Sequence, residues 1–240
     1  MNIAGFQSTT LLDYPGHIAC TVFTQGCNFR CPFCQNASLV LPELYEELLD
    51  TDEILSRIKK RRSIYEGVCI TGGEPTMQKD LSIFIKKIKN MGLLVKLDTN
   101  GTSPDTLEEL LSEDLLDMIA MDIKASKESY MRVCGLPENN KLFEKIERSV
   151  DIIKNSGIDH EFRTTVVKGL HDCDEIASIG EWLKGEKKFF LQVYRKSENI
   201  IGLLNGKTHC MDTPSDKELE AMLETAKQYI PETEIRGEDI

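Results

Sequence analysis

Three closely spaced cysteines are the residues of this sequence best suited to chemistry. Cys27, Cys31 and Cys34 have a C-x3-C-x2-C spacing, and no fourth cysteine lies close behind them. Three thiolates on one short loop can hold three irons of a four-iron cluster, whereas a cluster that only transfers electrons normally has four cysteine ligands. An open metal position usually serves a bound reactant, as it does in catalytic zinc sites. The spacing therefore predicts a catalytic iron–sulfur centre.

A structural zinc ion is the alternative use of these thiolates. Structural zinc sites take four ligands, commonly supplied as two separate pairs. The sequence offers one triplet, and the nearest histidine is His17. Zinc is therefore the less favoured interpretation, although spacing alone leaves it open.

Gly72, Gly73 and Glu74 form a second segment suited to ligand binding. They follow an apolar run, and two glycines allow a positive φ and a close approach of the backbone to a ligand. Glu74 adds a carboxylate, and backbone groups beside it could accept a hydrogen bond from an α-ammonium group. Gly-Gly is common in turns, so the prediction depends on its place directly after a strand, about 40 residues beyond the cysteines.

Two acidic segments each end a predicted strand. Asp98 and Asn100 belong to the sequence Asp-Thr-Asn-Gly, and Asp122 and Lys124 flank an isoleucine. Asn-Gly is a common turn, and an Asp–Lys pair at a strand end could be a simple salt bridge. The first segment could instead clamp a ribose or a metal cation. Both interpretations remain open from the residues alone.

Apolar runs of strand length alternate with amphipathic stretches. We predict strands over residues 19–24, 67–71, 93–97, 118–121, 161–167 and 189–193. We predict helices over residues 52–62, 80–90, 104–111, 141–155, 173–183 and 216–229, with Thr51 and Ser215 as N-caps. This alternation implies parallel strands joined by crossover helices, and six units are too few for an eight-fold barrel. The predicted fold class is therefore α/β, a partial (β/α)6 TIM-like barrel in one domain over residues 1–240.

The order of these elements also predicts where ligands bind. Parallel α/β folds bind ligands at the carboxyl ends of their strands. The cysteine loop and residues 72–74, 98–101 and 122–124 each follow such an end, so they are expected to converge on one site. The apolar and acidic stretch of residues 39–49 is expected to cover an edge of the sheet.

Composition limits the classes of function. The chain has 240 residues, 40% of them hydrophobic, and a net charge of -11, whereas a general nucleic-acid binder shows a basic stripe. No apolar run approaches the roughly 18 residues of a membrane span, and the first residues do not form a secretory signal. We therefore expect a cytoplasmic protein with no membrane or nucleic-acid partner. Its eight cysteines are expected to serve metal or redox chemistry.

The segment Cys27-x3-Cys31-x-Phe33-Cys34 is similar to the cluster-binding motif of radical S-adenosylmethionine (SAM) enzymes, and residues 72–75 resemble the second motif of that superfamily. The resemblance implies a partial α/β barrel in which the three cysteines hold a [4Fe–4S] cluster whose open iron chelates S-adenosylmethionine. It further implies that reduction of the cluster cleaves the sulfonium and yields a 5'-deoxyadenosyl radical. This chemistry belongs to the cofactors, which the protein orients. Phe33 could shield the cluster and meet a flat ligand ring, or simply pack in the core.

The two acidic segments resemble corresponding segments of glycyl-radical-enzyme activases. Arg163 matches an arginine of those activases, and its guanidinium could pair with the methionine carboxylate or form a salt bridge at the barrel mouth. The cofactor-binding residues that these resemblances imply are Phe33, Gly72, Gly73, Glu74, Asp98, Asn100, Asp122, Lys124 and Arg163.

A narrower resemblance is to the activating proteins of anaerobic ribonucleoside-triphosphate reductases. It depends on residues 5–6, 12–16 and 23–31, and it weakens after about residue 195. It implies a glycyl-radical enzyme as partner, foremost an anaerobic ribonucleotide reductase, with flavodoxin or ferredoxin as electron donor. Pyruvate formate-lyase activases usually have a histidine where Arg195 falls, which weakens the case for that partner. There is no eight-cysteine insertion after Cys34, so a single cluster is expected.

Other classes of function stay open. A radical enzyme of the same superfamily could act on a small molecule, as 7-carboxy-7-deazaguanine synthase does, and a non-catalytic module would bind zinc.

Cys20 and Cys69 lie in predicted strands and are interpreted as core residues. Cys134, Cys173 and Cys210 are far apart in the sequence, so no second metal site is predicted.

Overall fold

The structure is a computed structural model that describes residues 1–197, 199–204 and 211–237, apart from the side chain of Asn140. Its strands are β1 (Ile3–Thr10), β2 (Ala19–Thr24), β3 (Gly67–Gly72), β4 (Leu94–Thr99), β5 (Met118–Asp122), β6 (Asp159–Val166), β7 (Phe189–Val193) and β8 (Glu234–Arg236). Its α-helices are α1 (Ala37–Val40), α2 (Thr51–Lys60), α3 (Leu81–Lys89), α4 (Pro104–Ser112), α5 (Tyr130–Val133), α6 (Asn140–Asn155), α7 (Cys173–Trp182), α8 (Ile201–Leu204) and α9 (Asp216–Lys227). Two 3-10 turns, η1 (Pro42–Leu44) and η2 (Pro75–Met77), complete the elements.

The chain forms two compact units. The first contains Met1–Asn28, Ser38–Ala120 and Lys145–His160, and the second contains Phe29–Ala37, Met121–Glu144 and Glu161–Ile240. Strands follow chain order in each, from β1 to the start of β5 in the first unit and from the end of β5 to β8 in the second. The cysteine loop is divided between them, because Cys27 belongs to the first unit and Cys31 and Cys34 to the second.

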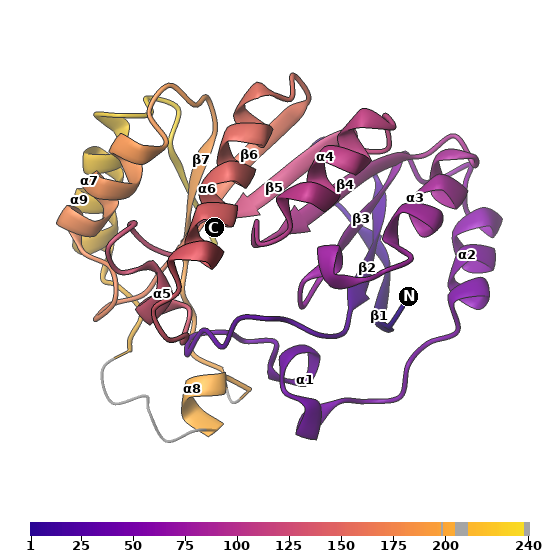
Figure 1. Ribbon diagram of the computed structural model, residues 1–240, viewed down its shortest axis with the longest axis horizontal. Helices are drawn as coiled ribbons and strands as arrows, with labels where there is room; N and C mark the ends of the chain where they lie inside the picture. Colours follow the sequence, from indigo (N-terminus) through magenta and orange to yellow (C-terminus); the bar gives the residue numbers. More distant parts are fainter. Residues whose placement is uncertain (198, 205–210, 238–240) are drawn as a thin grey trace. The chain divides into compact units, whose positions relative to one another are not determined.

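In the first unit, the predicted site residues follow the carboxyl ends of parallel strands. β2 pairs in parallel with β3, and β3 with β4, while β1 lies antiparallel to β2 at the edge. Helices α2 and α3 lie beside these strands (Figure 1) and bury apolar side chains at helical spacing, among them Ile54 and Ile58 of α2 and Phe84 and Ile88 of α3.

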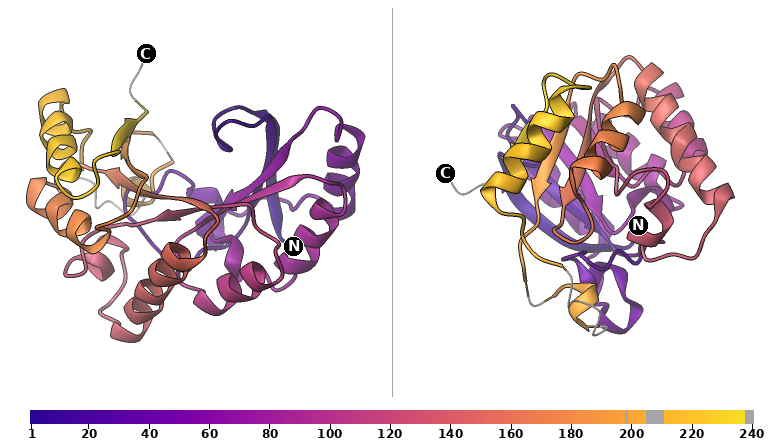
Figure 2. Two further views of the ribbon diagram at one scale, coloured as in Figure 1. Left: turned by 90° about the horizontal axis from the view of Figure 1, so that it is seen from above. Right: turned by 90° about the vertical axis from the view of Figure 1, so that its left-hand side faces the viewer.

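In the second unit, β6 pairs in parallel with β7, and β7 with β8. Helices α7 and α9 pack side by side there, as both views of Figure 2 show. Asp172 caps α7 through the backbone N–H of Glu175, and Ser215 and Glu218 form a capping box at the start of α9. These caps fix where both helices begin.

The six predicted strands and six predicted helices are all present, within a few residues of their predicted ends. Ser215 caps its helix as predicted, but Thr51 does not: the Asp50 side chain accepts from the N–H of Glu53 and caps α2 instead. Strands β1 and β8 were not predicted. In the stretch of residues 39–49, Leu49 forms an isolated antiparallel bridge with Ile3 of the edge strand. None of the helices in the described residues has the length and apolarity needed to cross a membrane.

Candidate functional site

The turn after β3 lies directly against the backbone that leads into Cys27. The N–H of Gly73 donates to the carbonyl of Thr24 at 2.9 Å. A Cβ on Gly72, where φ is +124°, would lie 2.3 Å from the Thr24 nitrogen, and one on Gly73 would lie 2.1 Å from the Gly26 oxygen. No side chain fits at either position. The two glycines therefore permit the turn after β3 to pack closely on the backbone that precedes Cys27. This packing fixes the position of that backbone.

Glu74 is a buried carboxylate whose hydrogen bonds all come from neutral groups of the protein. It accepts from the N–H and hydroxyl of Thr76 at 3.1 and 2.5 Å, from the Thr99 hydroxyl at 2.8 Å and from the Asn100 N–H at 2.6 Å. Burial raises the pKa of Glu74, while these hydrogen bonds oppose the increase. Glu74 thus ties the turn after β3 to the turn after β4, and its oxygens are engaged before any ligand arrives.

Asn100 is directed at the first cysteine of the loop. Its Nδ2 donates to Oδ1 of Asn28 at 2.9 Å and lies 3.9 Å from Sγ of Cys27. Its Oδ1 accepts from the N–H and hydroxyl of Thr102, at 3.0 and 2.7 Å, which fixes the orientation of the amide. The amide group of Asn100 is therefore held facing the Cys27 sulfur.

Asp98 is paired with the protein's own cation. The ammonium group of Lys96 donates to Oδ1 of Asp98, and the Lys96 side chain is almost completely buried. A buried ammonium group requires such a partner. Lys96 and Asp98 are two residues apart on β4, so their side chains lie on the same face of the strand. This spacing is a signal in the sequence from which the pairing could be inferred.

Cys31 and Cys34 lie in the second unit with a further thiol. The N–H of Cys34 donates to the carbonyl of Cys31 at 3.0 Å, and the Cys134 side chain is hydrogen-bonded to the Cys31 side chain. That hydrogen bond and the charge of Lys124 lower the pKa of Cys31 against the effect of burial, whereas burial raises the pKa of Cys34. No spacing in the sequence indicated that Cys134 approaches Cys31.

The loop that carries these cysteines is fixed by backbone contacts on both sides. The N–H of Arg30 donates to the carbonyl of Cys134 at 2.9 Å, and a Cβ on Gly135 would lie 2.2 Å from the Arg30 oxygen. The N–H of Ile201 donates to the carbonyl of Cys34 at 3.1 Å. Helix α8 and the end of α5 therefore hold the loop within the second unit.

Five charged side chains form a chain of ion pairs in the second unit. Asp122 accepts from Lys124 Nζ at 3.0 Å and from Arg163 Nε at 2.9 Å. Arg236 donates to both oxygens of Glu161 at 2.8 Å, and Glu161 also lies 3.9 Å from Arg163 Nη1. Although burial opposes it, the charges of Arg163 and Lys124 lower the pKa of Asp122 to about 2. The chain of ion pairs therefore contains three cations and two carboxylates.

The Glu161–Arg236 pair was not predicted, because its members lie far apart in the sequence and β8 itself was missed. Phe33 was predicted to meet either a ligand ring or the core. It is buried, and its ring meets that of His171 edge-on at 6.3 Å between centroids. His171 in turn accepts from the Val167 N–H at 3.1 Å and lies 2.9 Å from the Lys124 carbonyl.

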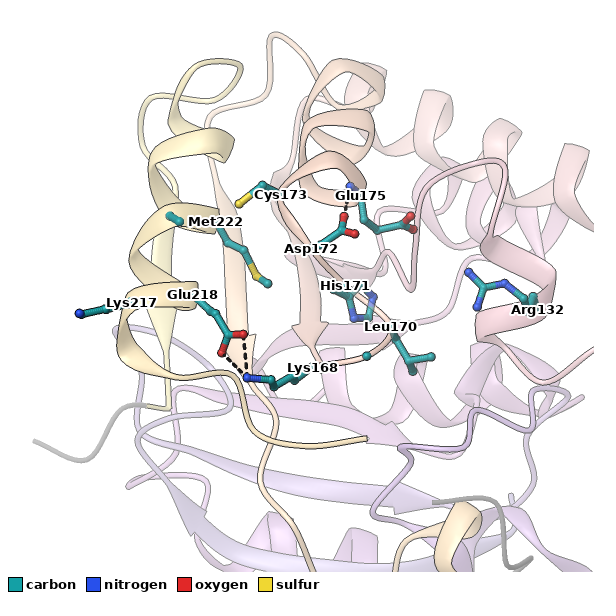
Figure 3. Close-up of a pocket in the computed structure, with 12 residues that line it drawn as sticks. Arg132, Lys168, Leu170, His171, Asp172, Cys173, Glu175, Lys217, Glu218 and Met222 are labelled. Atoms are coloured by element: carbon teal, nitrogen blue, oxygen red, sulfur yellow. Dashed lines mark hydrogen bonds and ion pairs between the residues drawn. The ribbon is translucent and has the colours of Figure 1, made fainter. Parts of the chain in front are cut away.

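A pocket of about 600 Å³ opens in the same unit, between the turn after β6 and helices α7 and α9 (Figure 3). Lys168 and Glu218 form an ion pair of 2.8 Å across it, and Cys173 lines it. No residue predicted to bind a cofactor or metal lines this pocket. Cys210, whose role was left open, lies outside the described residues.

The donor set of the cysteine loop suits an iron–sulfur cluster, since soft thiolates favour such clusters and no carboxylate competes within the C-x3-C-x2-C segment. Among the described residues, no three His, Cys, Asp or Glu side chains are gathered into a metal-binding group. Ligation by Cys27, Cys31 and Cys34 therefore stays a prediction, based on the number, softness and spacing of the thiols.

Comparison with known proteins identifies the family. Residues 21–181 match the model of the radical SAM superfamily. A Methanocaldococcus jannaschii protein named "Putative glycyl-radical enzyme activating enzyme" is 30% identical over 236 residues, which cover 98% of this chain and 95% of that protein. The pyruvate formate-lyase-activating enzyme of Clostridium pasteurianum is 28% identical over 206 residues, which cover 80% of this chain and 81% of that enzyme.

The fold agrees with that family. The structure of Streptococcus suis SuiB bound to S-adenosylmethionine matches with a TM-score of 0.67 at 14% identity, covering 89% of this chain and 48% of SuiB. This likeness, with the mostly parallel strands, confirms the predicted α/β class of partial TIM-like barrels. The chain belongs to the radical SAM superfamily, whose members use a [4Fe–4S] cluster and S-adenosylmethionine, and within it resembles the glycyl-radical-enzyme activases.

Proposed function

We propose that this chain generates a glycyl radical on a partner enzyme, and that the partner is an anaerobic ribonucleoside-triphosphate reductase. The observation that carries the first part is the end-to-end similarity to the M. jannaschii protein named "Putative glycyl-radical enzyme activating enzyme", which covers 98% of this chain. The choice of partner is supported by the resemblance of residues 5–6, 12–16 and 23–31 to activating proteins of those reductases.

In this proposal Cys27, Cys31 and Cys34 hold the cluster, and flavodoxin or ferredoxin is the electron donor. When bound, the cluster and S-adenosylmethionine supply a carbon-centred radical able to take a hydrogen atom from a glycine of the partner. The chain's own task is to hold the thiols, orient the cofactor and exclude competing reactions.

The charged residues of the second unit suit the methionine end of S-adenosylmethionine. Arg163 and Lys124 both donate to Asp122, and a guanidinium group has the geometry to bind the carboxylate of a ligand. The low pKa of Asp122 keeps it ionised near neutral pH, so it anchors both cations. In the first unit, Asn100 orients its amide toward Cys27, and Glu74 holds the turn that carries Asn100.

Pyruvate formate-lyase is the second candidate partner. The similarity to the C. pasteurianum activase, at 28% identity over 81% of that enzyme, favours it. The exposed Arg195, where such activases usually carry a histidine, weakens it.

Anaerobic reconstitution with iron and sulfide, followed by reductant and S-adenosylmethionine, tests the proposal. Each candidate enzyme is added separately, and the glycyl radical is sought as an EPR doublet. A doublet with the reductase supports the full proposal, and a doublet only with pyruvate formate-lyase replaces the partner. Cleavage of S-adenosylmethionine without a doublet on either enzyme rejects both partners and favours a small-molecule substrate, to be sought by product analysis.

A further inference from the structure

Residues 42–48, which we call the acidic lip, expose large apolar side chains in the first unit. Leu44, Tyr45 and Leu48 are 39%, 38% and 42% exposed, whereas Val40 and Leu41, just before the lip, are buried. The prediction that residues 39–49 cover a sheet edge therefore does not account for the lip, since only Leu49 bridges β1. Exposed apolar side chains with a polar rim are typical of interaction sites.

The acidic lip is held beside the backbone that enters the cysteine loop. Gln25 Nε2 donates to the carbonyl of Glu46 at 3.3 Å, and the Gly26 N–H donates to the carbonyl of Leu39 at 2.7 Å. The hydroxyl oxygen of Tyr45 lies 3.8 Å from the position of a Cβ on Gly26. Gly26 directly precedes Cys27, so a molecule docked on the lip would lie beside the first cysteine of the loop.

The charge of the lip is unbalanced. The sequence contains no Lys, Arg or His from residue 31 to residue 56. Glu43, Glu46 and Glu47 are exposed, and within the described residues none of them forms an ion pair. On the following helix, by contrast, Asp52 pairs with Lys87 at 3.4 Å and Glu53 pairs with Arg57 at 2.5 Å. The lip therefore presents a negative potential that no ion pair within the described residues neutralises.

We propose that the acidic lip docks a basic polypeptide segment of the glycyl-radical enzyme. Apolar side chains of that segment would pack on Leu44, Tyr45 and Leu48, and its Lys and Arg side chains would face the three glutamates. Charge complementarity of this kind accelerates association and fixes the register of a complex. The inference is built on the proposed function, but binding and radical formation are measured separately.

The test uses matched pairs of variants. Glu46→Lys with Glu47→Lys reverses two charges of the lip, and Glu220→Lys with Glu224→Lys does the same on the exposed face of α9, where neither glutamate has an ion pair among the described residues. Leu44→Ser with Leu48→Ser removes apolar surface from the lip. Its control, Ile64→Ser with Ile83→Ser, changes exposed isoleucines after α2 and on α3.

Binding of each reconstituted protein to purified anaerobic ribonucleotide reductase and to pyruvate formate-lyase is measured by biolayer interferometry at low and high salt. S-adenosylmethionine cleavage with dithionite, in the absence of a partner, checks that every variant keeps an intact cofactor site. We expect the lip charge reversal to weaken the Kd at least about tenfold and to remove most of its salt dependence. The lip leucine variant should weaken the Kd about five- to tenfold, and both controls should bind like the unmodified protein.

The two proposals fail in different ways. A glycyl doublet together with an unchanged Kd in both lip variants would overturn the docking inference and leave the proposed function intact. Binding that depends on the lip but gives no doublet would reject the proposed function and support the docking surface. If neither enzyme binds while both still acquire a doublet, docking on the lip is also rejected.

Discussion

Glu74 and Asp122 are both carboxylates placed after parallel strands, yet their surroundings differ. Glu74, in the first unit, is bound by the N–H and hydroxyl groups of Thr76, Thr99 and Asn100. Asp122, in the second, is bound by two cations, and an ion pair of Glu161 with Arg236 continues the chain of charges. Burial raises the pKa of Glu74, whereas the neighbouring charges lower that of Asp122 to about 2.

Glu74 and Asp122 therefore have different roles, although in the sequence each is a carboxylate that follows a predicted strand. Neutral donors satisfy the oxygens of Glu74 by hydrogen bonds, so we interpret that carboxylate as a brace between two turns. Asp122 is instead paired with the cations Lys124 and Arg163, so we expect that region to attract an anionic group of a ligand. We therefore expect substitutions near Asp122 to change cofactor binding and substitutions near Glu74 to change stability.

The largest effect is expected at the three thiols, of which Cys27 lies in the first unit and Cys31 and Cys34 in the second. Serine at Cys27, Cys31 or Cys34 should reduce the iron content and slow S-adenosylmethionine cleavage at least about a thousandfold, because each thiolate is a proposed ligand. Iron analysis and a cleavage assay measure both. Cys173→Ser is the control, since Cys173 lines the separate pocket of Figure 3. Normal iron content in any of the three variants would remove that residue from the ligand set.

Arg163→Gln should raise the KM for S-adenosylmethionine by about 10- to 100-fold, because a charge-assisted hydrogen bond to the ligand carboxylate is lost. Initial rates of partner-independent cleavage give KM and kcat. Arg148→Gln is the matched control, since within the described part of the chain Arg148 forms exposed ion pairs with Asp105 and Glu108. An unchanged KM in the Arg163 variant would show that the ion pairs around Asp122 are structural. Asp122 and Glu74 would then have the same kind of role.

Glu74→Gln should lower the free energy of unfolding by about 1–3 kcal/mol, because a side-chain NH2 would then face the donors that now meet a carboxylate oxygen. The KM for S-adenosylmethionine should stay within about twofold of that of the unmodified protein. Urea unfolding of the cluster-free protein measures the first quantity, with Glu53→Gln on the exposed face of α2 as control. The brace role is contradicted if stability is unchanged and KM rises.

The smallest effect is a pH dependence at His171. Burial lowers the pKa of this histidine, whose Nδ1 accepts from the Val167 N–H. The unfolded chain then binds a proton more readily than the folded one. His171 therefore imposes no penalty above about pH 6.5, and stability falls below that pH by at most about 1.4 kcal/mol per pH unit.

Urea unfolding of the cluster-free protein at several pH values measures this slope. His171→Gln should flatten it, and His160→Gln, at a half-buried histidine of β6, should leave it in place. A slope that survives in the His171 variant would assign the pH dependence to other groups.

The fold was largely predictable because buried strands in a parallel sheet are short apolar runs with polar residues at their ends. β2 and β7 have their predicted bounds. β1 was missed because it lies at the edge with exposed residues in its second half, and β8 because it has three residues.

The site was predictable in position but less so in role. Residues after strand ends were identified, yet whether a carboxylate meets donors or cations depends on neighbours supplied by other strands. Thr99 and Asn100 reach Glu74 from β4 and the turn that follows it, and Arg236 reaches Glu161 from the short β8. The spacing of residues in the sequence does not indicate partners that come from other strands.

The central claim is that the cysteine loop holds a cluster with one iron open to S-adenosylmethionine. The most direct test is EPR of the reduced, reconstituted protein before and after S-adenosylmethionine is added, with iron and sulfide analysis of the same sample. We predict about four irons and four sulfides per chain and a clear change of the cluster signal on addition. A protein that takes up no iron, or a cluster signal that S-adenosylmethionine leaves unchanged, would contradict the claim.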